Sequence, residues 1–452
     1  MKNIILSLWI STLPLMSLIA QDTGGILEQY IQTGLAQNLA LQQEKLEVQK
    51  SLAALREAKS LFYPQVSFEA TYTRAAGGRT IDIPVGDLLN PVYQTLNDLS
   101  AAPQFPSEIS NASEPILPDD FHDTRIFVQQ PLYNAEIYLN YKLRQALSSA
   151  QEIQKSTYEQ ELRKEIKEAY YQYLQTQEVL AIYDSTESLL QEVVRINQEL
   201  VNNHKVTKDV VFAAKFELED LYGKQAEALQ QAQMAKSYFN FLLNRSLDEE
   251  IERDSSLQAS PSLYGTLAVQ QEKALATRSE LAQIREAIYA QELNVQLQQA
   301  KKLPNLSLGA MAGFQGFGYK FNGQQDYALL QLNLSVPIYT AGKNEAKILQ
   351  SQIQLEHTQS QYQHLQQRIR LQVIDAFTGL QAALSKIEAK EAALASARES
   401  FRIIRRKYEE NLVLFVELLD ARTRFTNAQL EYVIANYDLL IKQAQLERAL
   451  AL

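Results

Sequence analysis

The stretch "FYPQVSFEATYT" (Phe62–Thr73) and the later stretch "KLPNLSLGAMAG" (Lys302–Gly313) follow the same plan. In each, a tract of helix-forming residues meets a proline, Pro64 or Pro304, and the sequence then changes to a strand-like rhythm. Proline interrupts a helix because it has no amide hydrogen, and period-two alternation indicates a strand. The chain is therefore predicted to pass from helix to strand twice, at corresponding points.

Two further pairs of motifs indicate an internal duplication. "QQPLYNAE", with Pro131, corresponds to "LSVPIYTAGKN", with Pro337, and "KDVVFAAKF" from Lys208 corresponds to "VELLDARTR" from Val416. Each half is thus predicted as helix, strand, loop, strand, long helix, turn and long helix. The predicted fold class is α+β, with mostly long coiled-coil helices and four strands per chain.

The domain boundaries follow from this duplication. The first structural repeat is predicted at residues 21–250 and the second at residues 251–452. The strands are expected near residues 65–74, 124–133, 305–319 and 327–339. The two long helical hairpins are expected to turn near residues 203–208 and 409–416.

The predicted strands have one apolar and one polar side. Val66, Phe68, Ala70 and Tyr72 alternate with polar residues, and the segment 330–338 alternates in the same way. Such strands suit a β-barrel in lipid with a wet interior, and a soluble amphipathic sheet shows the same alternation. Four strands cannot close a barrel, because lipid tolerates no unpaired sheet edge. Either the strands form a sheet of a soluble protein, or several chains contribute strands to one barrel.

The segment 76–122 separates the first two predicted strands. It holds half of the chain's 12 prolines, the pair Gly77-Gly78 and a single basic residue, Arg79. We expect a long irregular loop there, outside the cell because it lies at a hairpin tip. A role in partner contact or plugging is one interpretation, and a plain surface loop is the other.

The long helical tracts carry apolar residues at coiled-coil spacing. One stripe begins at Leu162 and another at Ile369, and each continues in steps of four and three. A helix of about 70 residues extends roughly 100 Å. The helices therefore suit either a periplasm-spanning tube or a solid stalk. Polar interruptions at Thr176, Glu187 and Asn197 favour walls that line water.

The N-terminus has the features of a secretory signal peptide at residues 1–20. Lys2 supplies a basic start, an apolar run follows, and Ala20 supplies a small residue at the expected cleavage site. A membrane-spanning anchor is the weaker interpretation, because Pro14 interrupts the apolar run.

The composition argues against enzymatic and nucleic-acid functions. The chain has no cysteine, which excludes thiol catalysis and cysteine-ligated metal, and its 4 histidines show no metal-binding motif. A net charge of −10 gives no support for nucleic-acid binding. We expect no cofactor, no metal and no enzymatic activity.

The duplicated pattern resembles the TolC-type outer-membrane efflux protein family over residues 21–452. The motifs that carry the resemblance are "NLALQQ" from Asn38, "YPQVS" from Tyr63, "QPLYN" from Gln130, "LPNLSLG" from Leu303, "VPIYTAGKN" from Val336 and, most specifically, "VELLDARTRFTNAQLEYVIANYDLLIKQAQLERAL" from Val416.

This resemblance implies a homotrimer in the outer membrane, in which each chain gives four strands to one shared barrel and long helices form a periplasmic barrel. It also implies docking with a periplasmic adaptor protein and an inner-membrane pump of the RND, ABC or MFS type. The expected function is a passive exit duct for efflux or type I secretion. The alternative is a structural coiled-coil protein without a pore.

Several site residues follow from the resemblance. Glu417 and Asp420 match carboxylates that ring the periplasmic entrance, and three copies on a narrow axis would favour cations. Alternatively, these two acidic residues only stabilise the positive N-terminal end of a helix.

Tyr408 and Asp209 match a polar link that holds the entrance closed, whereas a second link is missing its arginine, since Val413 stands there. Lys205 or Lys208 is a candidate substitute. Asn203 and Asn411 are expected to replace the usual glycines of the helix-tip turns, where the adaptor docks, because asparagine tolerates left-handed backbone angles.

Overall fold

The computed structural model describes residues 25–254, 265–410 and 412–452. The predicted signal peptide at residues 1–20 lies outside these residues, as does Asn411. The chain divides into two compact units. The sheet unit comprises Val48–Gln151 and Gln283–Tyr362, and the helical unit comprises the described parts of Met1–Glu47, Glu152–Ala282 and Gln363–Leu452.

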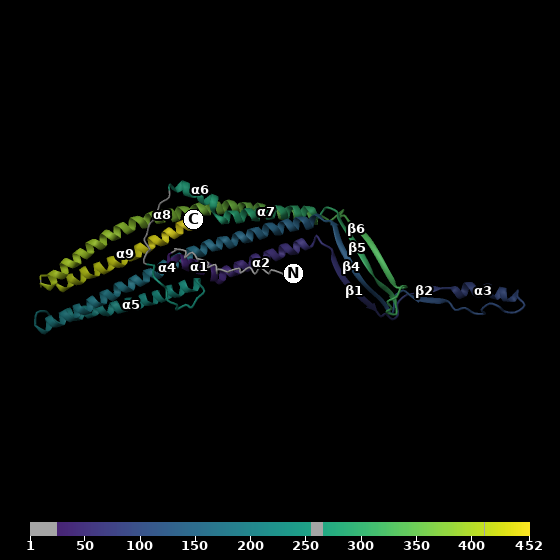
Figure 1. Cartoon of the computed structure of the whole chain (residues 1–452), viewed down its shortest axis with the longest axis horizontal. Coiled ribbons are helices and arrows are strands. Elements are labelled where there is room, and N and C mark those ends of the chain that lie inside the picture. Colours follow the sequence, from purple (N-terminus) through teal and green to yellow (C-terminus); the bar gives the residue numbers. More distant parts are fainter. Residues whose placement is uncertain (1–24, 255–264, 411) are drawn as a thin grey trace, which may run out of the picture. The chain divides into compact units, whose positions relative to one another are not determined.

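The chain forms a lone helix, pairs of helices and a longer run of helices that are separated by groups of strands, most of them labelled in Figure 1. The helices are α1 (Ile26–Gln37), α2 (Leu39–Ser60), α3 (Val85–Asp98), α4 (Ala135–Asn202), α5 (Asp209–Leu242), α6 (Leu267–Thr277), α7 (Ser279–Ala300), α8 (Lys343–Glu409) and α9 (Phe415–Ala449). The strands are β1 (Gln65–Thr73), β2 (Thr80–Ile83), β3 (Ala112–Pro115), β4 (Phe121–Tyr133), β5 (Asn305–Phe317) and β6 (Asp326–Ser335).

The sheet unit is built on a four-stranded antiparallel sheet with the order β1-β4-β5-β6. β6 ends at Ser335, short of the expected limit near residue 339. Pro337 follows two residues later and has no amide hydrogen to donate to a neighbouring strand.

The segment 76–122 is more regular than the sequence suggested. It contains the short ribbon of β2 and β3 and the helix α3. Asn111 fastens the start of α3 by accepting the amide hydrogens of Gly86 and Asp87 at 2.9 and 3.1 Å. The expectation of an irregular loop is therefore wrong.

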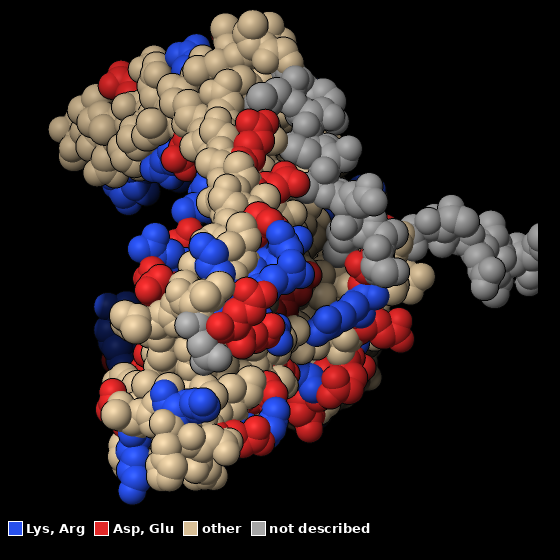
Figure 2. Space-filling model, turned by 90° about the vertical axis from the view of Figure 1, so that its left-hand side faces the viewer, with Lys and Arg blue, Asp and Glu red and all other residues tan. Residues whose placement is uncertain are grey.

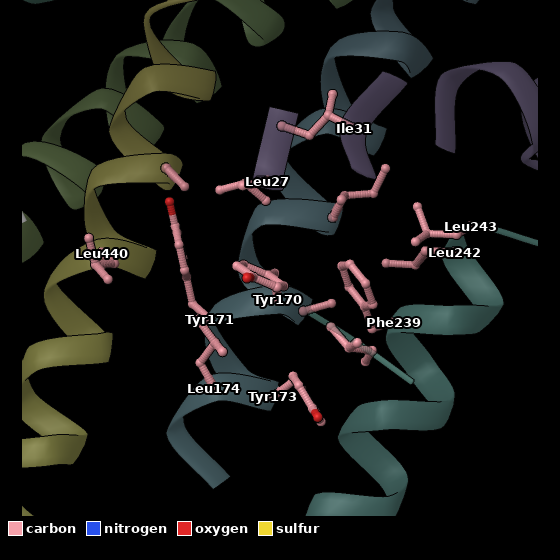
Figure 3. Close-up of a cluster of buried hydrophobic side chains, with 14 of the residues drawn as sticks. Leu27, Ile31, Tyr170, Tyr171, Tyr173, Leu174, Phe239, Leu242, Leu243 and Leu440 are labelled. Carbon is pink, nitrogen blue, oxygen red and sulfur yellow. The ribbon is translucent and has the colours of Figure 1, made fainter. Parts of the chain in front are cut away.

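The helical unit has a core where α1 lies against α4 and α5 (Figure 3). The rings of Tyr30 and Phe239 meet edge to face at 5.1 Å, and Tyr170 lies 5.5 Å from Phe239. Leu162 and Ile369, the first residues of the two apolar stripes, are fully buried. In the described chain, no helix combines the length and apolarity required to cross a bilayer.

An ionic cluster joins three helices of the same unit. Glu280, in the first turn of α7, lies 2.7 Å from Arg278 and 2.6 Å from Arg448 of α9, and Arg448 reaches Glu161 of α4 at 2.9 Å. Burial opposes ionisation of Glu280, but the hydrogen bond and charge of Arg278 and the charge of Arg448 outweigh it and lower the pKa of Glu280 to about 2.

Candidate functional site at the helix tips

The turn between α4 and α5 forms one of the two helix tips. The amide of Lys205 donates to the carbonyl of Leu200 at 2.9 Å, and His204 adopts a left-handed backbone with φ of 54°. This is the pattern of a Schellman cap, whose left-handed residue follows the helix. The left-handed residue is thus His204 rather than Asn203, whose side chain donates instead to the carbonyl of Glu199 at 2.9 Å.

The turn between α8 and α9 repeats the same backbone hydrogen bond. The amide of Leu412 donates to the carbonyl of Lys407 at 2.8 Å, five residues earlier, as Lys205 does to Leu200. By this hydrogen bond, residue 411 corresponds to His204 in the first turn. Asn203 and Asn411 therefore do not occupy equivalent positions, contrary to the expectation from the sequence. Asn411 itself lies outside the described residues.

Glu417 and Asp420 lie on exposed positions in the first turns of α9. A carboxylate oxygen of Glu417 accepts the amide hydrogen of Leu414 at 3.4 Å, as in a helix cap. Asp420 lies 2.9 Å from Arg424, one turn further along the same helix. The interpretation as helix-stabilising residues has structural support, and both carboxylates still face solvent.

Tyr408 links the second hairpin to the first. Its hydroxyl donates to the side-chain oxygen of Asn197 in α4 at 2.5 Å, and Asn197 is fully buried. Burial raises the pKa of Tyr408, against the opposing effect of the bond to Asn197. Within the described chain Tyr408 therefore contacts Asn197, while Asp209 accepts a hydrogen bond from the hydroxyl of Thr207. Tyr408–Asp209 stays a prediction.

A second link between the hairpins escaped the sequence analysis. Arg422 of α9 donates to Glu217 of α5 at 2.5 Å, and only 8% of its side chain is exposed. Val413, where the arginine of the second link is missing, is half-buried. Arg422 supplies a cation between the hairpins, and the substitution by Lys205 or Lys208 stays a prediction. The sequence indicated this link only through a charged residue, Arg422, at a position of α9 that otherwise suits an apolar residue.

A shared apolar core lies beneath these polar links. Its buried members come from α5, α8 and α9: Ala214, Phe401, Phe415, Leu418 and Ala421. On the face drawn in Figure 2, acidic and basic side chains are interspersed. A strongly negative entrance therefore needs several copies of Glu417 and Asp420 brought together. No group of three or more metal-ligating side chains occurs among the residues that the structure describes.

The sequence of the chain is similar to those of known outer membrane proteins. The family model described as outer membrane efflux protein matches residues 271–452. The alkaline protease secretion protein AprF of Pseudomonas aeruginosa is 23% identical over 72% of this chain and 69% of its own length. The outer membrane protein TolC of Escherichia coli is 28% identical over 34% of each chain.

The fold is also that of a solved membrane protein. The crystal structure of a membrane protein from Pseudomonas aeruginosa superposes with a TM-score of 0.77 over 94% of each chain, at 17% identity. A likeness at this identity concerns the fold. The family matched by residues 271–452 is made of channel proteins rather than enzymes. In sequence, the chain as a whole is similar to TolC-type outer membrane efflux proteins.

Proposed function

We propose that this chain is the outer-membrane exit duct of a tripartite efflux pump or type I secretion system. Three copies would each give four strands to one transmembrane barrel, and their long helices would form a tube in the periplasm. A signal peptide at residues 1–20 would direct export. Transport would be passive, because the inner-membrane partner supplies the energy.

The observation that carries this proposal is the two-sided sheet. The strand register places Val66, Phe68, Ile126 and Val128 on one face, together with Ala310. The same face continues in β6 with Leu330, Leu332 and Leu334. Phe68 is 71% exposed and Leu330 is 70% exposed. An apolar face this exposed needs lipid or protein to cover it.

The free edges of the sheet support pairing with further copies of the chain. β1 and β6 each pair with one strand in the described chain, so each presents a free edge. An unpaired edge is not tolerated in lipid, since its amide and carbonyl groups find no partner there. Pairing β6 of one copy with β1 of the next satisfies both edges and closes the sheet.

The helical hairpins support the internal duplication. α4 and α8 have 68 and 67 residues, and α5 and α9 have 34 and 35. Both tips close with the same hydrogen bond between residues five apart. On α5, Phe212 and Phe216 are 67% and 70% exposed. Such apolar residues suit packing against the hairpin of a neighbouring copy.

The tips would meet the partner proteins. We assign docking of a periplasmic adaptor to the turns that contain Asn203 and Asn411, with an inner-membrane pump of the RND, ABC or MFS type behind it. Glu417 and Asp420 would ring the entrance, and Tyr408 and Asp209 would belong to its closing links. The relatives' names include a protein-secretion component and a cation efflux protein, CusC of Escherichia coli. Both cargo classes therefore stay open.

Single-channel recording of the detergent-extracted protein in a planar bilayer tests the proposal. The expected result is discrete conductance steps from protein that crosslinks as a trimer. A monomer that stays in solution without detergent and gives no steps would contradict the proposal. It would instead favour a coiled-coil structural protein.

A further inference from the structure

The polar face of the sheet holds a charged network. Glu69 in β1 lies directly opposite Arg125 in β4. Arg125 donates to Glu69 at 2.7 Å through one terminal nitrogen and at 3.0 Å through Nε. Its other terminal nitrogen donates to Asp123 at 2.8 Å. One guanidinium is therefore held between two carboxylates, one on its own strand and one on the neighbouring strand.

The network extends over β5 to the edge strand β6. The hydroxyl of Tyr327 donates to Asp123 at 3.0 Å. Tyr327 reaches across because the residue between it and Arg125 is Gly313, which pairs with both. A Cβ at position 313 would come within 2.8 Å of the Cβ of Arg125. The glycine thus permits the close approach of β4 and β5 under this network.

The network lies on the face of the sheet that the proposed function places inside the pore. Its members occupy the face opposite Phe68 and Leu330, which the proposed function assigns to lipid. The side chains of Glu69, Arg125 and Asp123 remain 43%, 32% and 19% exposed. They are therefore held in place and still in contact with the solvent on that side.

Resting on the proposed function, we infer that Glu69, Arg125 and Asp123 are specificity-determining residues in the strand-built part of the pore. Each copy contributes two carboxylates and one guanidinium, hence one net negative charge. Charged rings on the interior of a pore select ions by sign, and substitutions on this face tune selectivity. This zone is distinct from Glu417 and Asp420 at the helix tips.

The test measures the reversal potential in a salt gradient across a planar bilayer. Glu69→Gln combined with Asp123→Asn leaves the guanidinium alone, and the reversal potential is expected to move toward the anion limit. Arg125→Gln leaves both carboxylates and is expected to move it toward the cation limit. A network that only held the sheet together would not give shifts of opposite sign. Arg125→Lys preserves the charge and is expected to retain the original selectivity.

A matched control removes the same charge from the ribbon beyond the sheet. Asp82→Asn combined with Glu114→Gln alters two exposed carboxylates on β2 and β3 and is expected to leave the reversal potential unchanged. Equal shifts in this control, or no shift in the network variants of a conducting protein, would overturn the inference. Absence of conductance in the unmodified protein would count against the proposed function instead.

Discussion

The hydroxyl of Tyr408 in α8 donates a 2.5 Å hydrogen bond to Asn197 in α4, 211 residues away in the sequence. Asn197 is fully buried, and its amide nitrogen has no hydrogen-bond partner among the described residues. Within the described chain, the side chain of Asn197 keeps only this one hydrogen bond. Removing it would leave a buried polar group without a partner and would cost its full desolvation free energy. This single contact therefore contributes to holding the two hairpins together near their tips.

Tyr408→Phe is expected to loosen the tips and to increase the fraction of time that the channel is open. The lost bond corresponds to about 1–3 kcal/mol for a buried unsatisfied group. Bilayer recordings compare this variant with Tyr222→Phe, a tyrosine of α5 that is 38% exposed. An unchanged open fraction would show that this contact does not restrain the tips.

Asp209→Asn separates the observed contact from the link that the family resemblance implies. If Tyr408 acts through Asn197 alone, this variant should behave as the unmodified protein. If the Tyr408–Asp209 link forms in the assembled trimer, the variant should open as readily as Tyr408→Phe. The same recordings decide between these outcomes.

At the proposed entrance, Asp420→Asn combined with Glu417→Gln is expected to reduce the preference for cations. Each copy loses two negative charges while Arg424, the partner of Asp420, keeps its positive charge. Arg424→Gln is expected to have the opposite effect, since it removes the neighbouring cation and leaves both carboxylates. Reversal potentials that move in the same direction in both variants would exclude an electrostatic role for these residues.

Glu280 predicts a pH-dependent stability of the helical unit. Its pKa in the folded protein is about 2, below its ordinary value of 4.5, so its stabilisation is complete above that value and disappears as the pH falls towards 2. The side chain is only 19% exposed, and the shift corresponds to about 3 kcal/mol as an order of magnitude. Glu280→Gln should lower the thermal midpoint at pH 7 and much less at low pH.

The control for this measurement is Glu345→Gln in α8. Glu345 pairs with Lys302 at 2.8 Å, but its side chain is 61% exposed, so the pair contributes little. An equal loss of thermal stability in both variants at pH 7 would contradict the assignment to the buried cluster.

The segment 76–122 is expected to depend on the contact between Gly86 and the irregular stretch around Ile109 that follows α3. A Cβ at position 86 would lie 2.1 Å from the carbonyl oxygen of Ile109. Gly86→Ala should therefore displace α3 and make the segment sensitive to protease, without loss of the proposed trimer. Gly323→Ala, where a Cβ would meet nothing within 4 Å, is the matched control.

The alternation in the sequence located the apolar side of β1 and β6, because every second residue there is apolar. It was less informative for β4, where Phe127 interrupts the pattern between Ile126 and Val128. The register resolves this, since Val66 and Phe68 lie opposite Val128 and Ile126. Pairing with a strand distant in sequence decides the face, and a local pattern does not contain that information.

The polar interruptions of the helical stripes were harder to interpret. Asn197 was expected on a wall that lines water, yet it is fully buried beside Tyr408. The helix α3 was missed because Gly86 and Pro91 lie within it, and both residues are unfavourable in a helix interior. In both cases, contacts with residues outside the local sequence override the local preference.

The free edges of β1 and β6 have a consequence for how such a protein is inherited and expressed. In the proposed trimer, every copy supplies an edge to both of its neighbours, so a copy with a defective β6 leaves one seam open and the shared barrel unclosed. A chain with Leu332→Pro in β6, produced together with the normal chain, should therefore inactivate normal copies as well. Mutations in these edge strands would behave as dominant, whereas a simple loss of one chain's own activity would be recessive.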